Sequence, residues 1–262
     1  MTQDGREVRF YDDLIQGKVV AVNFFFTHCK DLCPAETANL VRLDKMLGDR
    51  VGRDVHLYSI SIDPQYDSPE ALRHYAAKFK ASRNWIFLTG KADDVALIRK
   101  KLGLLGSGED AGKLENHKST LIVGNEATAQ WMKRSAFDDP GVLKNLLVYS
   151  LQKLPVSSGS AVSYAAAQIP KRMTAGEELF KSRCDSCHSP GGDARLGPGL
   201  VGILQRRNRA WLARWIKVPD ELLAHKDPVA MELLAHYGEL QMPNLKLSND
   251  DVEALMGYLQ TL

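Results

Sequence analysis

Two short cysteine motifs stand out among the residues whose chemistry can carry function. The first follows an apolar run, "NFFFTHCKDLCP" at 23–34, and places Cys29 and Cys33 four residues apart; the second is "CDSCH" at 184–188. All four cysteines of the chain lie in these motifs, so they do not form a scattered disulfide framework. Each pair must therefore be explained by chemistry at its own site.

The second motif has the Cys-x-x-Cys-His spacing at which c-type haem is attached. On the first turn of a helix, Cys184 and Cys187 lie on one face, where each thiol can add to one haem vinyl group and His188 is directed at the iron. A zinc knuckle or a redox dithiol would need further ligands nearby or a sheet, and residues 189–262 predict neither. We therefore expect one covalently attached haem c.

A sixth iron ligand must come from downstream. The segment "GELQMPNL" at 238–245 offers Met242 between a polar loop and a proline, and a thioether suits a haem of high potential. The other candidates are two methionines in helical patterns, where core packing is the simpler explanation, and two histidines: Met231, Met256, His225 and His236. We expect Met242 to be the ligand.

These motifs resemble a class I cytochrome c. The resemblance covers about 174–262 and is carried by "CDSCH", "LGPGL" at 196–200, "MPNL" at 242–245 and a C-terminal helix. It implies that the carbonyl of Pro198 accepts a hydrogen bond from the His188 imidazole, which would fix the orientation of that iron ligand.

The first cysteine pair lies between an expected strand and an expected helix. Unpaired amides and the dipole at a helix N-terminus stabilise a thiolate, so Cys29 should be reactive. A spacing of four residues places the two sulfurs one helical turn apart on the same face. They can therefore join as a disulfide or bind one metal ion. Thiolates select Cu(I), and an added imidazole gives a set that also holds Cu(II).

Two histidines are candidates for that imidazole. His117, in "KLENHKST", lies in a loop before the strand 119–123, and a thioredoxin-like fold can bring this loop beside the first helix. His28 adjoins Cys29, but neighbouring residues of a strand point to opposite faces. We therefore expect His28 to point away from the site.

The N-terminal motifs together resemble the Sco/SenC family, thioredoxin-fold copper proteins that assist assembly of cytochrome c oxidase. The resemblance spans about 8–153 and rests on "FFFTHCKDLCP", "SISIDPQYDSPEAL" at 59–72, "WIFLTG" and "NHKSTLIVG". It implies that Cys29, Cys33 and His117 are the copper ligands. Asp31 and Asp63 either support those ligands or are turn and cap residues.

The chain departs from the family pattern in two places. Lys30 stands where the family usually has proline, and Asn116 where it usually has aspartate before the histidine. The positive charge of Lys30 would favour thiolates, whereas loss of a carboxylate beside His117 would weaken the orientation of its ring. Both changes leave the ligand set intact.

Strands alternate with helices in the first half of the chain and helices alone follow in the second. Strands are predicted at 19–26, 54–62, 84–90, 119–124 and 129–135, and helices at 34–47, 68–80, 92–103 and 140–153. Helical patterns recur at 174–186, 208–217, 228–237 and 248–260. We therefore predict a thioredoxin-like α/β domain at 1–153, a Ser/Ala/Gly-rich linker at 154–173 and a small all-α cytochrome c domain at 174–262.

Composition narrows the setting. The net charge of +2 is spread along the chain, which favours no nucleic-acid partner. The longest apolar stretch falls short of the ~20 residues that span a bilayer, and the opening residues lack the pattern of a signal peptide. We expect a soluble chain whose export signal or N-terminal anchor has been removed or never existed. Covalent haem attachment and disulfide chemistry predict a bacterial periplasm.

Three functions compete for this pattern. The leading prediction is a copper metallochaperone or thiol reductant for the copper-site subunit of cytochrome c oxidase or another periplasmic copper protein, with the haem exchanging electrons with the copper site. A general thiol–disulfide oxidoreductase is the second. The third is a peroxidase in which Cys29 reduces peroxide and the haem supplies electrons.

Overall fold

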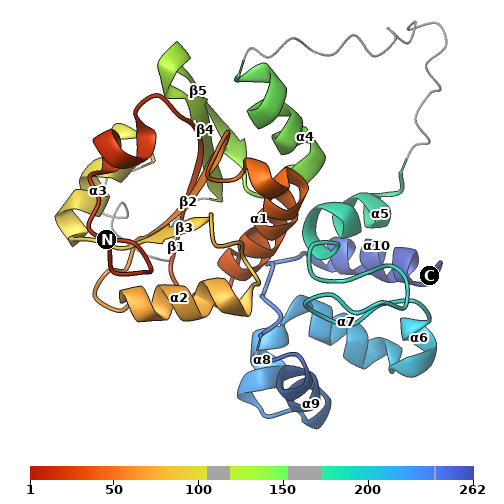
Figure 1. Cartoon of the computed structure of the whole chain (residues 1–262). Helices are drawn as coiled ribbons and strands as arrows, with labels where there is room; N and C mark the ends of the chain where they lie inside the picture. The colour runs from red at the N-terminus through yellow and green to blue at the C-terminus, as the bar shows by residue number, and fades with distance from the viewer. Residues whose placement is uncertain (105–118, 153–172, 239) are drawn as a thin grey trace, which may run out of the picture.

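The computed structural model describes residues 1–104, 119–152, 173–238 and 240–262. A domain built on a β-sheet is followed by a domain of short helices (Figure 1). Of the predicted linker at 154–173, only Met173 is among the described residues. His117 lies outside them. No helix among the described residues is long and apolar enough to cross a membrane.

The sheet of the N-terminal domain is mixed. In its order β3-β2-β1-β4-β5, β1 is parallel to β2 and antiparallel to β4, β3 is parallel to β2, and β5 forms a hairpin with β4. The strands are β1 (Val19–Phe25), β2 (His56–Ser61), β3 (Ile86–Leu88), β4 (Thr120–Asn125) and β5 (Gln130–Ser135). The carboxyl ends of β1, β2 and β3 consequently meet at one edge of the sheet, where the first cysteine motif begins.

Helices cover both faces of the sheet, as predicted. They are η1 (Phe10–Ile15), α1 (Cys33–Leu47), η2 (Gly48–Arg50), α2 (Pro69–Lys78), α3 (Ala92–Lys101), η5 (Glu126–Thr128), α4 (Pro140–Asn145) and η6 (Leu146–Ser150). Side chains alternate between the faces of a strand. Phe25 of β1 therefore packs in the core beneath α1, whereas Phe24 packs in the core beneath η1 and α3. Every residue of β1 is buried because it lies in the middle of this sandwich.

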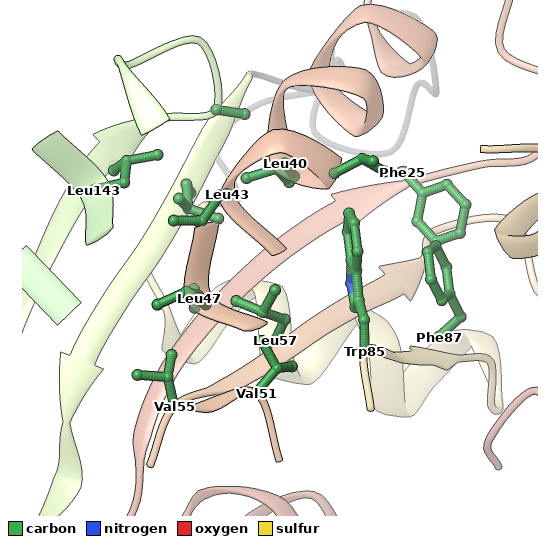
Figure 2. Packing of buried hydrophobic residues seen from close by; sticks show 14 of the residues in the cluster. Phe25, Leu40, Leu43, Leu47, Val51, Val55, Leu57, Trp85, Phe87 and Leu143 are labelled. Atoms are coloured by element: carbon green, nitrogen blue, oxygen red, sulfur yellow. The ribbon is translucent and has the colours of Figure 1, made fainter. Parts of the chain in front are cut away.

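The core beneath α1 holds the aromatic residues that support the first motif. The Phe25 ring lies edge-on to Phe87 at 5.6 Å between centroids, and Trp85 stacks on Phe87 at 5.0 Å. Figure 2 shows this group beside Leu40 of α1. Twelve of the fifteen residues of α1 are buried, because this helix is covered by the sheet on one side and by the C-terminal domain on another. The helix that begins at Cys33 is thus held on more than one side.

The C-terminal domain contains helices and no strand among its described residues. The helices are α5 (Ala175–Leu179), η8 (Phe180–Cys184), α6 (Ile203–Arg206), α7 (Arg209–Lys217), α8 (Pro219–Ala224), α9 (Pro228–His236) and α10 (Asn249–Leu259). α10 begins with a capping box, in which the Ser248 hydroxyl accepts from the N–H of Asp251 and the Asp251 carboxylate accepts from the N–H of Ser248. A Cβ at Gly176 of α5 would lie 2.0 Å from the carbonyl oxygen of Ala254, so glycine permits the close approach of α5 and α10.

The predicted elements are confirmed with small shifts at their ends. β1 stops at Phe25, one residue short of the prediction, and the predicted helix 140–153 consists of α4 followed by the wider turns of η6. α6 and α8 were not predicted, because four and six residues are too few to establish a helical period.

Candidate functional site

The first cysteine pair lies where the central strand gives way to a helix. β1 ends at Phe25, and α1 begins at Cys33 with Pro34 in its first turn, where a missing N–H costs no helical hydrogen bond. Cys33 is fully buried, whereas Cys29 is 9% exposed and lines a cavity. The two thiols therefore differ in access as well as in position.

The two thiols differ in pKa because of hydrogen bonding and burial. The pKa of Cys29 is lowered, first because the Cys33 thiol donates to its sulfur and then because the backbone N–H groups of Cys33 and Asp31 do. The pKa of Cys33 is raised far above its ordinary value by burial and by the proximity of Cys29. The main cause of the lowered Cys29 pKa is hydrogen bonding, not the charge of Lys30. Cys29 is accordingly the thiol that ionises more readily, and Cys33 is the more deeply buried of the two.

This asymmetry predicts the pH dependence of alkylation. Because thiolate forms as the pH rises through the pKa, Cys29 should react with iodoacetamide at a lower pH than the ~8.5 of an ordinary thiol. Cys33 should remain unmodified over the same range. Mass spectrometry of peptides from reduced protein gives both profiles. Equal profiles for the two cysteines would contradict the assignment, and Cys29→Ser should remove the early phase.

A buried carboxylate braces the turn that carries Cys29. Asp67, which is fully buried, accepts hydrogen bonds from the backbone N–H and hydroxyl of Thr27 and from the hydroxyl of Ser61. It therefore ties the turn after β1 to the end of β2. Sequence analysis missed Asp67. The available signal was an acidic residue next to Ser68 that is not needed as a cap, because Ser68 itself caps α2.

The described residues do not bring His28 together with Cys29 and Cys33, so the expectation that it points away from the site stays a prediction, although the strand argument behind it does not hold. Residues 26–29 follow the end of β1, so the alternation of a strand does not apply to them, and His28 and Cys29 line the same cavity. The His28 ring lies 4.4 Å from the Tyr66 ring, and its Nε2 lies 3.6 Å from the Asp63 carboxylate. The cavity wall thus includes an exposed imidazole that sequence reasoning set aside.

The two acidic residues left open by the sequence have separate positions. The carbonyl of Asp63 accepts from the N–H groups of Tyr66 and Asp67, which makes it a turn residue, while its carboxylate faces His28. Asp31 forms an ion pair of 3.2 Å with Lys246 of the C-terminal domain. His117 and Asn116 lie outside the described residues. Within the described ranges, no three His, Cys, Asp or Glu side chains come together as a metal site.

The second motif lies on a crevice in the C-terminal domain. His188 Nδ1 lies 3.0 Å from the Pro198 carbonyl oxygen, the contact that the resemblance implied. His188, Pro198 and Met242 line two adjoining apolar cavities, with Cys187 in the wall of one and Cys184 in the wall of the other.

The residues around this crevice fit a haem c. Burial lowers the pKa of His188, which favours the neutral imidazole needed by a metal. Burial also raises the pKa of Cys184 to about 12 and that of Cys187 to about 11, so both stay as thiols until they are attached. A Cβ at Gly197 would lie 2.5 Å from the His188 ring. Glycine there leaves room for the ring in this orientation.

Of the five candidates for the sixth ligand, Met242 alone lines the crevice with His188 among the described residues. Met256 is 2% exposed in the core beneath α10, and Met231 is 39% exposed on α9. The two histidines are exposed, His225 with Nδ1 at 2.7 Å from the Glu221 carbonyl and His236 against Tyr237. Met242 stays a prediction that this placement supports.

The two candidate sites share part of their walls. The cavity beside Cys29 and the crevice beside His188 are both lined by Pro34, Phe79, Leu240 and Gln241. Cys187 also packs against the core beneath α1. The cysteine pair and the haem crevice are thus neighbours across the domain interface.

Two family models match the chain: SCO1/SenC over residues 1–136 and cytochrome c over residues 173–262. The chain is 39% identical over 89 residues to the SCO1 protein homolog of Bacillus subtilis (strain 168), across 34% of this chain and 45% of that protein. It thus spans less than half the length of that relative.

Two solved structures are also similar. Arabidopsis thaliana ScoI with copper bound is 23% identical, with a TM-score of 0.47 over 59% of this chain and 95% of that chain. The cytochrome c domain of a Pseudomonas putida protein is 44% identical, with a TM-score of 0.31 over 33% of this chain and 85% of that domain.

The predicted fold class, a thioredoxin-like α/β domain followed by a small all-α cytochrome c domain, is confirmed by the mixed sheet and by the two family matches. The cytochrome c domain implies a haem c. Because the SCO1/SenC model matches more than half of the 262 residues, the chain belongs to the SCO1/SenC family and carries a cytochrome c domain C-terminal to the Sco domain.

Proposed function

We propose that this chain carries copper at Cys29, Cys33 and His117 and assists assembly of the copper centre of cytochrome c oxidase in a bacterial periplasm. Delivery of copper and reduction of the receiving cysteines are the two forms of that assistance. One observation supports the proposal above others. A thiol with a lowered pKa, Cys29, opens on a cavity that adjoins the haem crevice, and its partner Cys33 is buried at the start of α1.

Copper is the cargo in this proposal, and the chain supplies its ligands. The Cys29 thiolate is the first donor, and displacement of the proton from Cys33 provides the second. These two soft donors suffice for Cu(I), whereas the imidazole of His117 makes the set suitable for Cu(II) as well. The division of the chain into 1–153, a linker at 154–173 and 174–262 is part of the same proposal.

The haem adds one-electron redox chemistry to the site when it is bound. Cys184 and Cys187 would attach it, His188 and Met242 would ligate the iron, and the Pro198 carbonyl would hold the His188 ring. We infer that the haem exchanges electrons with the copper or dithiol site, because the two cavities share walls.

A general thiol–disulfide oxidoreductase is the second candidate. The asymmetry between Cys29 and Cys33 supports it, because a low-pKa thiol at a cavity and a more deeply buried partner are the arrangement of a redox dithiol. A peroxidase needs only a reactive Cys29 and has no separate observation in its favour. Affinity for copper separates the first two candidates, since a redox dithiol has no need to hold Cu(I) against a chelator.

Copper titration against a strong Cu(I) chelator tests the proposal. The intact chain should retain Cu(I), and Cys29→Ser and Cys33→Ser should lose it. His117→Ala should keep Cu(I) far better than Cu(II), because two thiolates satisfy the soft ion while Cu(II) needs the imidazole. His28→Ala is the matched control, since it removes an exposed imidazole from the same cavity.

Two results would count against the proposal. Loss of Cu(I) from the intact chain to the chelator would favour the oxidoreductase. Equal loss of both copper ions from folded His117→Ala, or an equal effect in His28→Ala, would show that His117 does not act as proposed.

A further inference from the structure

The segments of the C-terminal domain that carry the CDSCH motif and Met242 contact α1 and the loop before it. Asp185, which lies inside the CDSCH motif, forms an ion pair of 2.8 Å with Arg42 of α1. Lys246, four residues after Met242, forms its pair with Asp31, which lies between Cys29 and Cys33. The segment that attaches the haem thus contacts α1. The segment that offers the sixth ligand contacts the loop before α1.

The two ion pairs differ in setting. The side chains of Arg42 and Asp185 are 32% and 17% exposed, and Asp185 also pairs with Arg195 at 2.8 Å. Those of Lys246 and Asp31 are 62% and 49% exposed, so their direct contribution to stability is small. The role of the ion pairs is positional: they determine which part of the Met242 segment faces the cysteine loop.

Apolar contacts continue this docking between the pairs. Leu240 and Gln241, which precede Met242, line both the cavity beside Cys29 and the crevice beside His188. Leu240 also packs against the core beneath α1. The segment 240–246 is therefore in contact with the cysteine site at its first residue and at its last.

We propose that α1 and the loop before it couple the two sites, so that the haem potential depends on whether Cys29 and Cys33 are a dithiol or a disulfide, with Asp31, Lys246, Arg42 and Asp185 as positioning residues. This inference rests on the proposed function, because it needs the haem and the redox-active cysteine pair. It goes beyond that function by assigning the docked face a regulatory role.

The physical cause is a rearrangement that both sites share. Closing a disulfide between residues 29 and 33 changes the conformation of the loop that holds Asp31, and the Lys246 contact passes that change to the Met242 segment. By linkage, a coupling that shifts the haem equilibrium shifts the dithiol equilibrium by the same factor. A thiolate at Cys29 also acts through space, because negative charge near the haem favours the ferric form. That effect needs no contact, so a variant can distinguish the two.

Spectroelectrochemical titration of the full haem-loaded chain tests the coupling. The haem midpoint is measured anaerobically for the dithiol and disulfide forms, and free thiols are counted before and after each titration. In the unmodified chain the ferric-to-ferrous ratio at fixed applied potential should differ at least ~5-fold between the forms, the lower end of usual couplings. In Lys246→Glu the difference should shrink by more than half.

Matched variants separate the contact from a change of charge. Lys226→Glu makes the same change of charge at another exposed lysine of the C-terminal domain. Lys226 also has a left-handed backbone, with φ +53° against +54° for Lys246. This variant should leave the difference in haem midpoint between the dithiol and disulfide forms intact. Asp31→Lys combined with Lys246→Glu reverses the pair and should restore the difference. The single variant Asp31→Lys is measured beside it, because the charge of Asp31 also acts on Cys29. Arg42→Glu should reduce the difference in the same direction as Lys246→Glu.

Three outcomes would overturn the inference. One is an equal midpoint in both forms of the unmodified chain. Another is a difference that survives in Lys246→Glu, which would mean through-space electrostatics alone. The last is equal loss in Lys226→Glu. Failure of the proposed function would look different, as absence of the haem spectrum or of copper retention in the chelator competition.

Discussion

Replacing Met242 with alanine should remove the long-wavelength absorption band of a thioether bound to ferric haem iron and should lower the reduction potential substantially. A methionine opposite histidine raises the potential of a c-type haem, and axial ligands together set haem potentials over a range of about 0.8 V. Met242 lines both cavities of the crevice, as His188 does, so its removal leaves no thioether there among the described residues. Visible spectra and a potentiometric titration of the purified variant measure both effects.

Met231→Ala is the control for this experiment, because Met231 is exposed on α9 and lines neither cavity of the crevice. It should leave the band and the potential unchanged. An unchanged band in Met242→Ala would transfer the role to Met231 or Met256. Methionine placement in the crevice would then be a matter of packing alone.

Ferrous haem should leave a Cys29–Cys33 disulfide intact, whereas Cu(I) added to copper-free ferric protein should reduce the haem. Protein disulfides have potentials from about −120 mV to below −300 mV, and a His/Met haem lies well above them. A gap of several hundred millivolts makes reduction of the disulfide by ferrous haem uphill by about 10 kcal/mol or more, since 30 mV is about 1.4 kcal/mol for two electrons. Electrons should therefore pass towards the haem.

Stoichiometry decides this experiment. Each chain carries one haem, so reduction of one disulfide to two thiols would consume two ferrous haems from two chains. Anaerobic spectra follow the haem, and a thiol reagent counts the cysteines. Cu(I) reduces one ferric haem and becomes Cu(II). The appearance of two thiols as two ferrous haems are oxidised, with no other reductant present, would make the cytochrome domain the reductant of the Sco domain.

The sequence by itself determined the elements and the chemistry of the motifs. The apolar run before Cys29 predicts β1, and Pro34 predicts the start of α1, because hydrophobic period and proline act over a few residues. The spacing in CDSCH likewise predicts haem attachment, because the chemistry of the haem vinyl groups and iron requires it. The placement of Met242 beside a proline, apart from the helical methionines, supports its role in the same way.

The tertiary structure decided which residues share a surface. The strand argument for His28 does not apply because β1 ends at Phe25. The role of Asp67 depends on hydrogen bonds between segments 40 residues apart, which no local pattern specifies. Inequality between Cys29 and Cys33 likewise depends on burial.

The proximity of the two redox sites is the clearest case. The two domains carry no local pattern that specifies how they dock, because the contacts of that interface lie far apart in sequence. Pro34 and Phe79 meet Leu240 and Gln241 only when both domains are folded and packed together. Motifs thus identified the copper and haem chemistry, while packing of the two domains placed the cysteine pair beside the haem crevice.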